Sequence, residues 1–423
     1  MLIGIGVAIG SGIFRTPGDV ASRLSSPWLI LAAWSIGGLI VLMQGMVTAE
    51  LGTRFPKAGG EYVFLKEAYG EFAAFLFGWA YTIFIIGGGA AAIALAFGDF
   101  STDLFALTDG WTGPLAASSI VAVTMVNAVG LRLGAGAQNV LTAIKVIALL
   151  AFVAAGMIYG SISLSPQKVA TSAAVDVGIG PFIIGLLPVL WSYEGTTDSV
   201  KMAEEISDVR RALPRALIGS AIAVTLLYLL VNVALMRVLA PAEMNGVASA
   251  PGEAMGRLFG PKGRNAVLLA GMFVCLGSLS STVLATIRVT FALARDGLTF
   301  RFLSRMSKAQ APVPALMAAG GFAVILVLYR RFEEALGIYF FAGAILFASV
   351  YASLIVFRLR EAGFPKDVYR CPWGIAQALV LIVIQMALAA NIARVSPRDA
   401  AYTALLLVFI VGLYWVWPRR RVS

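Results

Sequence analysis

The sequence predicts an all-α integral membrane protein with about twelve transmembrane helices. Of its 423 residues, 60% are hydrophobic and only 13% are charged, and the mean hydropathy is +0.89. A soluble globular domain cannot bury that much apolar surface. The hydrophobic residues also lie in blocks of about 20, the length with which a helix crosses roughly 30 Å of hydrocarbon. The chain is therefore expected to cross a membrane repeatedly.

The hydrophobic blocks follow one another without an inserted soluble domain, so we expect residues 1–423 to form one transmembrane domain. The expected spans are 1–23, 27–51, 72–98, 115–131, 137–160, 179–200, 213–239, 264–294, 312–329, 334–357, 374–393 and 399–417.

The basic residues predict the orientation of these spans. An even number of spans puts both termini on one side of the membrane, and if that side is the cytoplasm, 19 of the 32 Lys and Arg residues lie in cytoplasmic loops. This asymmetry follows the positive-inside rule and predicts a multi-pass protein of the cell membrane with cytoplasmic termini. It also accounts for the net charge of +10 without nucleic acid as a partner.

The spacing of the spans predicts an internal repeat. Spans one to five and six to ten begin at matching intervals, with an offset of about 178 to 197 residues. Because five is odd, the second set crosses in the opposite sense, as in the inverted repeats of secondary transporters. We expect a first repeat over 1–163, a second over 179–357, and two additional helices over 374–417.

The first span contains a glycine-rich segment, Gly10–Gly12, which weakens a helix near its middle. A break there would direct free N–H groups of the second half-helix toward a carboxylate at the bilayer midplane, while carbonyls ending the first half would face an ammonium. Small residues also form packing faces between membrane helices, so this segment alone leaves both interpretations open.

The sixth span is interrupted at the corresponding place of the second half, where polar residues and Gly195 break the apolar run Trp191–Asp198. Two interrupted segments in matching positions indicate a transporter binding site at the repeat interface. This pairing favours broken helices over simple packing faces.

Of the residues of the sixth span, Glu194 has the highest free-energy cost of placement in the membrane, because a carboxylate at that depth must be paired, hydrated or protonated. It can gate, relay a proton or pair with a substrate ammonium, or it is interfacial if the span ends nearby. Asp198 lies closer to the cytoplasm and is expected to be solvated.

Lys145 lies about seven residues inside the fifth span. Its stem can snorkel toward the interface, or its ammonium can face the unwound carbonyls of the first span and do what a bound sodium does elsewhere. Hydroxyls of the eighth span can ligate a cation or accept from Lys145, although such groups also bond to their own helix. They are Ser278, Ser280, Ser281 and Thr282.

Aromatic side chains near the predicted breaks are candidates for gates. Trp191, Tyr339, Phe340 and Phe341 are the candidates. Because most aromatics in such a chain pack or lie at the membrane interface, Trp191 alone is predicted to act as a gate.

Three further segments carry a resemblance to a known family. Gly10–Phe14, the loop Phe55–Tyr62 and Ala294–Gly297 resemble the amino acid–polyamine–organocation superfamily. Thr142–Lys145 and Tyr193–Gly195 make the chain most similar to bacterial members of the L-type amino acid transporter family. The resemblance covers essentially the whole chain.

The resemblance implies a leucine-transporter-like fold that binds α-amino acids by their backbone groups at two broken helices. In such a site Lys145 occupies the place of a sodium ion, with Ser280 or Ser281 as its partner. The pair Thr196–Thr197 departs from the bulkier residues often found in the family, which leaves the preferred side chain open. The implied substrate-binding residues are Ile9, Gly10, Ser11, Gly12, Ile13, Trp191, Tyr193, Glu194 and Gly195.

These observations predict a secondary amino acid transporter that exchanges or facilitates transport by alternating access, independently of sodium and without cofactor, metal or required accessory subunit. Three alternatives remain: a proton-coupled symporter using Glu194, an amino acid sensor that does not transport, and a membrane enzyme using Glu194, Asp198 and Lys145 as acid/base groups. Without histidine or a recognisable cofactor motif, the enzyme is the weakest of these.

Overall fold

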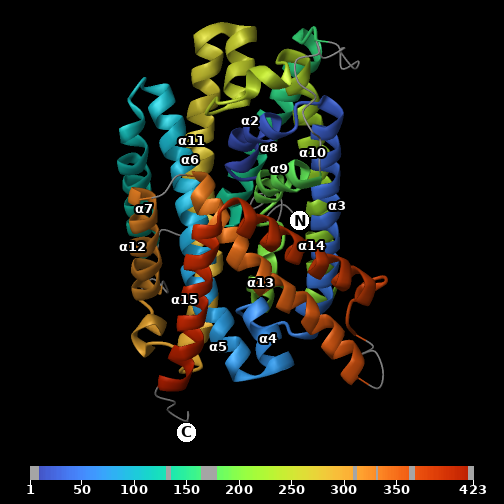
Figure 1. The fold of residues 1–423 in the computed structure, drawn as a ribbon, viewed down its shortest axis with the longest axis vertical. Helices are drawn as coiled ribbons and strands as arrows, with labels where there is room; N and C mark the ends of the chain where they lie inside the picture. Colours follow the sequence, from blue (N-terminus) through green and yellow to red (C-terminus); the bar gives the residue numbers. More distant parts are fainter. Residues whose placement is uncertain are drawn as a thin grey trace.

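The computed structural model describes residues 9–129, 135–162, 179–307, 312–329, 332–361 and 367–417. Figure 1 shows a bundle of long helices, with α4 (Glu61–Tyr69) and the C-terminus at one end. The other α-helices are α2 (Gly12–Arg23), α3 (Pro27–Arg54), α5 (Glu71–Ala80), α6 (Gly88–Leu104), α7 (Thr112–Val129), α8 (Ala135–Tyr159), α9 (Ile179–Ser192), α10 (Val209–Val238), α11 (Ala250–Arg295), α12 (Val313–Tyr329), α13 (Phe332–Arg360), α14 (Gly374–Val395) and α15 (Pro397–Val416).

The predicted all-α membrane class is confirmed. Within the described ranges, nine helical stretches are long and apolar enough to cross a membrane, and two shorter apolar helices, Phe182–Ser192 and Val313–Tyr329, accompany them. Together with α2, these segments follow the order of the twelve predicted spans. The chain is therefore a multi-pass membrane protein, whereas the repeat boundaries at 1–163 and 179–357 stay a prediction.

Helix α11 begins earlier than the predicted span 264–294. It starts at Ala250 and contains a kink at Gly260, where φ is +72°, followed by Pro261. Glycine tolerates this left-handed backbone, and proline starts the next helical segment without needing its missing N–H. A separate helical turn therefore precedes the membrane-crossing part of α11.

The third span contains a π-helix that the sequence did not predict. Helix α5 passes into η1 (Tyr81–Gly87), a seven-residue π-helix, and then into α6. Such a segment shifts the side chains that follow it around the helix axis, and π-helical turns often occur at functional sites. Here the π-helix begins at Tyr81, which lies inside the bundle and is 1% exposed.

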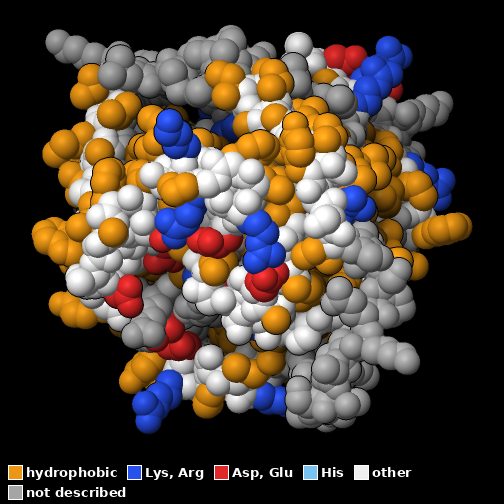
Figure 2. Space-filling model, turned by 90° about the horizontal axis from the view of Figure 1, so that it is seen from above, with side chains coloured by type: hydrophobic (Ala, Val, Ile, Leu, Met, Phe, Trp, Pro, Cys, Tyr) orange, Lys and Arg blue, Asp and Glu red, His pale blue; other side chains and the backbone are white. Residues whose placement is uncertain are grey.

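Side chains that face outward from the bundle are largely apolar. Figure 2 shows hydrophobic side chains around most of the edge of the end opposite α4, with charged side chains among them and toward the middle. Large exposed hydrophobic residues occur on many helices, for example Leu39, Val129, Phe273 and Val408. In water such a surface would be an aggregation liability, but it suits contact with lipid chains.

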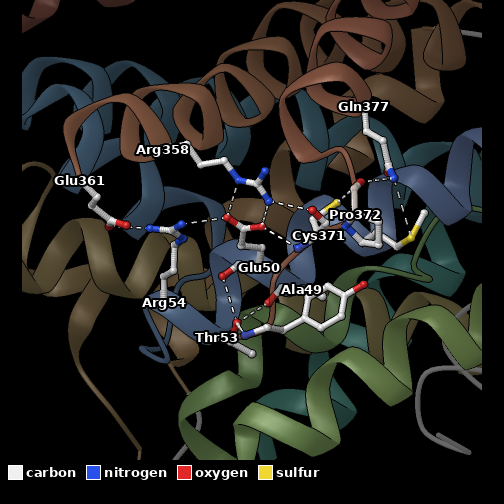
Figure 3. Close-up of polar contacts among 11 residues, drawn as sticks. Ala49, Glu50, Thr53, Arg54, Arg358, Glu361, Cys371, Pro372 and Gln377 are labelled. Carbon is white, nitrogen blue, oxygen red and sulfur yellow. Dashed lines mark hydrogen bonds and ion pairs between the residues drawn. The ribbon is translucent and has the colours of Figure 1, made fainter. Parts of the chain in front are cut away.

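A buried ion cluster fastens three helices near the α4 end of the bundle (Figure 3). The carboxylate of Glu50 in α3 is fully buried and accepts from Arg54 (2.9 Å), from Nε of Arg358 in α13 (3.0 Å) and from the Cys371 N–H before α14 (2.7 Å). Arg54 also binds Glu361 (2.5 Å). With two guanidinium groups and a backbone donor, the buried carboxylate is well compensated.

Replacing Glu50 by Ala should destabilise the protein by about 3–5 kcal/mol, because two arginines would lose their buried partner. Thermal unfolding in detergent micelles checks this expectation. Glu361→Ala is the matched control: it removes another carboxylate from Arg54, but its side chain is 33% exposed, so its loss should cost about 0–1 kcal/mol. Equal losses of stability in both variants would contradict this role of Glu50.

Candidate functional site

The predicted interruption of the sixth span is confirmed. Helix α9 ends at Ser192, the residues Tyr193–Thr197 form turns, and the 3₁₀-helix η3 (Asp198–Glu205) follows. Gly195 in this turn has a φ of +90°, a conformation that side chains with a Cβ rarely adopt. The glycine seen in the sequence therefore makes the break possible.

The first span agrees with its predicted break over the part that is described. Residues 9–11 form a bend and α2 begins at Gly12, while residues 1–8, which would hold the first half-helix, lie outside the described residues. The first four N–H groups of any α-helix lack a carbonyl partner within that helix. Here the Phe14 and Arg15 N–H groups both donate to the Ser11 carbonyl (3.2 Å each), so the candidate donors to a ligand are the amides of the bend before Phe14.

The two breaks lie against each other because α2 approaches α9 closely. The hydroxyls of Thr16 and Ser192 are 2.6 Å apart, and a Cβ added to Gly12 would lie 2.5 Å from Cα of Ser192. No real side chain fits at that distance. Gly12 is thus required for the contact between the helices, as well as for access to the amides.

A small cavity of about 50 Å³, called the substrate cavity below, lies between the two breaks. Ile9, Ile13 and Tyr193, which were predicted to contact substrate, do not line it; Tyr193 instead donates its hydroxyl to the Trp34 carbonyl (3.0 Å). The residues that line it are Gly10, Ser11, Gly12, Tyr81, Ile85, Gly89, Ile93, Trp191, Ser192, Glu194, Gly195, Asp198, Lys201, Ser278, Thr282, Thr286 and Tyr339.

Trp191 lies on the wall of this cavity, as expected of a gate, but it does not lie there alone. The ring of Tyr339 from α13 contacts it edge-on with centroids 5.3 Å apart, and the Tyr339 hydroxyl donates to Oε1 of Glu194 (2.6 Å). Beyond Trp191 lies Phe332, whose ring is covered by the guanidinium of Arg15 at 5.0 Å. Sequence reasoning named Tyr339 as a candidate and then set it aside.

Lys145 reaches the bend of the first span. Its Nζ donates to the carbonyl oxygen of Ile9 (3.1 Å), and the residue is 9% exposed. The ammonium is therefore buried and does not snorkel to the interface. The hydroxyl of Ser280 donates to Oδ1 of Asn127 in α7 (2.8 Å), and the pairing of Lys145 with Ser280 or Ser281 stays a prediction.

The expectation that Asp198 is solvated is wrong. Asp198 and Lys201 are 5% and 3% exposed, and Nζ of Lys201 donates to Oδ1 of Asp198. The ammonium also lies 5.3 Å from the ring centre of Tyr81 in η1. The break bends η3 back into the bundle, where the loop before α4 covers it, as the bond from the Gly59 N–H to the Lys201 carbonyl shows (3.3 Å). The i, i+3 spacing of the pair was the one signal in the sequence.

Replacing Gly12 by Ala should separate α2 from α9 and destabilise the protein by about 1–3 kcal/mol, since the methyl group meets backbone atoms that cannot move aside. Thermal unfolding in micelles measures this loss. Gly321→Ala is the control, because nothing lies within 4 Å of a Cβ added there. If both variants unfold at the wild-type temperature, the close approach at Gly12 is not required.

Comparisons with known proteins agree with this geometry. A family model described as amino acid permease matches residues 1–414. The b(0,+)-type amino acid transporter 1 of Mus musculus is 28% identical over 97% of this chain and 84% of its own length. The serine/threonine exchanger SteT of Bacillus subtilis is 29% identical over 87% of this chain and 84% of its own length. Both relatives are named as transporters, and neither as an enzyme.

Proposed function

Because the chain belongs to the amino acid permease family, we propose that it moves α-amino acids by alternating access, as a sodium-independent exchanger or facilitator. The observation that carries this proposal is the buried ammonium of Lys145, 3.1 Å from the Ile9 carbonyl at the bend of the first span. The names of the two relatives support amino acids as the substrate class, and one of them supports exchange.

The substrate is recognised by the groups that every α-amino acid shares. Its carboxylate accepts from the free amides at Gly10–Gly12, where the positive end of the α2 dipole favours an anion. Its ammonium faces the carbonyls at the end of α9, which terminates at Ser192. The ring of Trp191 covers the bound zwitterion, and the side-chain pocket lies toward Thr196–Thr197.

Lys145 removes the need for sodium by supplying a positive charge that belongs to the protein. A sodium ion at a broken helix is held by unwound backbone carbonyls, and here an ammonium already takes the Ile9 carbonyl. The charge is tethered to α8, so it is neither bound nor released during the cycle. Transport then follows the amino acid gradients alone.

We place the protein in the cell membrane with both termini in the cytoplasm. The positive-inside distribution of Lys and Arg supports this orientation. In Figure 1, α4 and the C-terminal end of α15 lie at the same end of the bundle, which is the cytoplasmic end in this proposal.

Purified protein in liposomes should take up a radiolabelled amino acid in sodium-free buffer, and uptake should depend on amino acid inside the vesicles. Lys145→Ala should reduce the initial rate at least about tenfold, the effect of losing roughly 1.4 kcal/mol of stabilisation at the bend. Lys262→Ala, at an exposed lysine of α11, is the control for a lost positive charge.

Uptake only in the presence of a sodium gradient would contradict the role of Lys145. Uptake that needs no internal amino acid would favour facilitated transport over exchange. Binding of amino acid without flux, in buffer with or without sodium, would favour a sensor.

The second candidate function is proton-coupled symport at Glu194, which is favoured by the position of this carboxylate on the cavity wall beside the Tyr339 hydroxyl. If the protein is an exchanger, an imposed pH gradient should drive no accumulation of amino acid in the liposomes. Glu194→Gln, with Tyr339→Phe as its partner variant, should also retain counterflow. Accumulation driven by the gradient and abolished by Glu194→Gln would establish symport instead.

A further inference from the structure

A second polar cavity, of about 40 Å³, lies behind the turn of the sixth span and shares one wall with the substrate cavity. Glu194 lines both cavities, and Glu61, the first residue of α4, lines only the second. The polar residues of this cavity are Gln44, Thr48, Glu61, Tyr193, Glu194, Thr196, Thr197, Tyr339, Tyr351 and Gln385. The transport mechanism described above gives Glu61 no role.

Glu61 is a buried carboxyl with too few partners. The residue is 3% exposed, and its Oε2 atom is buried without a hydrogen-bond partner. Its Oε1 atom lies 4.0 Å from Nζ of Lys201, but that ammonium already bonds to Asp198. Two buried carboxyls thus share one ammonium, and a charge left uncompensated in the interior is strongly disfavoured.

The other side chains around Glu61 do not add a second positive charge. Across the break, Glu194 adds a further carboxyl, and Tyr81 of η1 and Tyr351 of α13 are phenols. Helices α3 and α14 contribute only uncharged side chains to the second cavity. Burial raises the pKa of the Glu61 carboxyl; the nearby Lys201 and, after it, a hydrogen bond from the backbone N–H of Glu61 oppose this rise, and Asp198 adds to it.

Glu61 lies in the seam where α4 closes the cytoplasmic end of the bundle. On one side of the seam, the Ala58 N–H donates to Oε2 of Glu204 (2.9 Å) in η3. On the other side, the Tyr62 hydroxyl (2.7 Å) and Nζ of Lys66 (2.6 Å) both donate to Oδ2 of Asp296, after the end of α11. Opening a path from the substrate cavity to the cytoplasm requires this seam to separate, which would expose Glu61 to water.

We propose that the Glu61 carboxyl binds a proton when α4 is docked on η3 and releases it to the cytoplasm when the two separate. Cytoplasmic protons then hold the cytoplasmic entrance shut. This inference rests on the alternating-access function proposed above. In strict exchange, the proton released on opening is taken up again on closing, so there is no net proton movement and the site differs from a symport site.

The test measures the labelling rate of a cavity residue by a membrane-impermeant thiol reagent in inside-out vesicles. Thr286→Cys supplies the reactive group on the cavity wall, in a background of Cys275→Ser and Cys371→Ser. Because only the thiolate reacts, the rate is divided at each pH by that of a free thiol such as N-acetylcysteine with the same reagent. We expect this normalised rate to fall as the pH is lowered from about 8 to about 5. The fall is about tenfold for each unit by which the Glu61 pKa differs between the docked and separated states.

Two variants, each at a Glu residue of α4, distinguish the effect of Glu61 from that of another carboxyl on the same helix. In Glu61→Gln the amide stays neutral at every pH, so labelling should remain slow throughout the range. Glu67→Gln is the matched control, because Glu67 is exposed and pairs with exposed Lys57; it should keep the wild-type pH dependence.

Asp198→Asn provides a second, directional test that does not alter Glu61. With its first partner gone, Lys201 stabilises the ionised Glu61, so the midpoint of the labelling curve should move to lower pH. An unchanged pH dependence in Glu61→Gln, or an unmoved midpoint in Asp198→Asn, would overturn the proposal. Because labelling is measured without substrate flux, a failure of transport in liposomes would leave these outcomes readable.

Discussion

A helix that breaks inside a membrane leaves backbone N–H and C=O groups without partners, and hydrocarbon offers no water to replace them. The organisation of this protein follows from how those open groups are used. The carbonyl of Ile9 is taken by the Lys145 ammonium, whereas Gly10, Ser11 and Gly12 at the start of α2 line the cavity. The same constraint explains why Gly12 and Gly195 stand where they do: one allows two breaks to touch, and the other allows the chain to turn between α9 and η3.

Two buried carboxyls, Glu50 and Glu61, differ in how well nearby positive groups compensate their negative charge. Glu50 is surrounded by two guanidinium groups and a backbone N–H, so its charge is fully compensated and it ties helices together. Glu61 is equally buried but shares a single ammonium with Asp198. A compensated carboxylate in a low-dielectric interior stabilises the packing of the helices around it. An undercompensated carboxylate favours that packing only when it is protonated, so the packing depends on pH. In the proposed transport cycle, Glu61 lies in the seam that separates when the cavity opens to the cytoplasm.

Much of the membrane architecture could be predicted from the sequence, because hydrophobic length and glycine-interrupted runs are local properties. The break at Gly195 belongs to this class. For Lys145 the residues alone left two positions open, the membrane interface and the bend of the first span, and only the family resemblance implied the second. The positions of Asp198, Lys201 and Tyr339 do not belong to this class, since they depend on how η3 and α13 fold back onto the cavity. Two other features could not be predicted from the sequence either. The π-helix at Tyr81 has no compositional signal, and the Glu50 cluster joins residues about 300 positions apart.

In the proposed function, the ends of two broken helices recognise the charged backbone groups of an amino acid. Thermal stabilisation of the purified protein by a panel of α-amino acids, each compared with its methyl ester and its N-acetyl derivative, tests this recognition. A free amino acid should raise the unfolding temperature and both of its derivatives should not, because each derivative removes one of the two charges. Equal stabilisation by the free amino acid and its derivatives would contradict recognition at the helix ends.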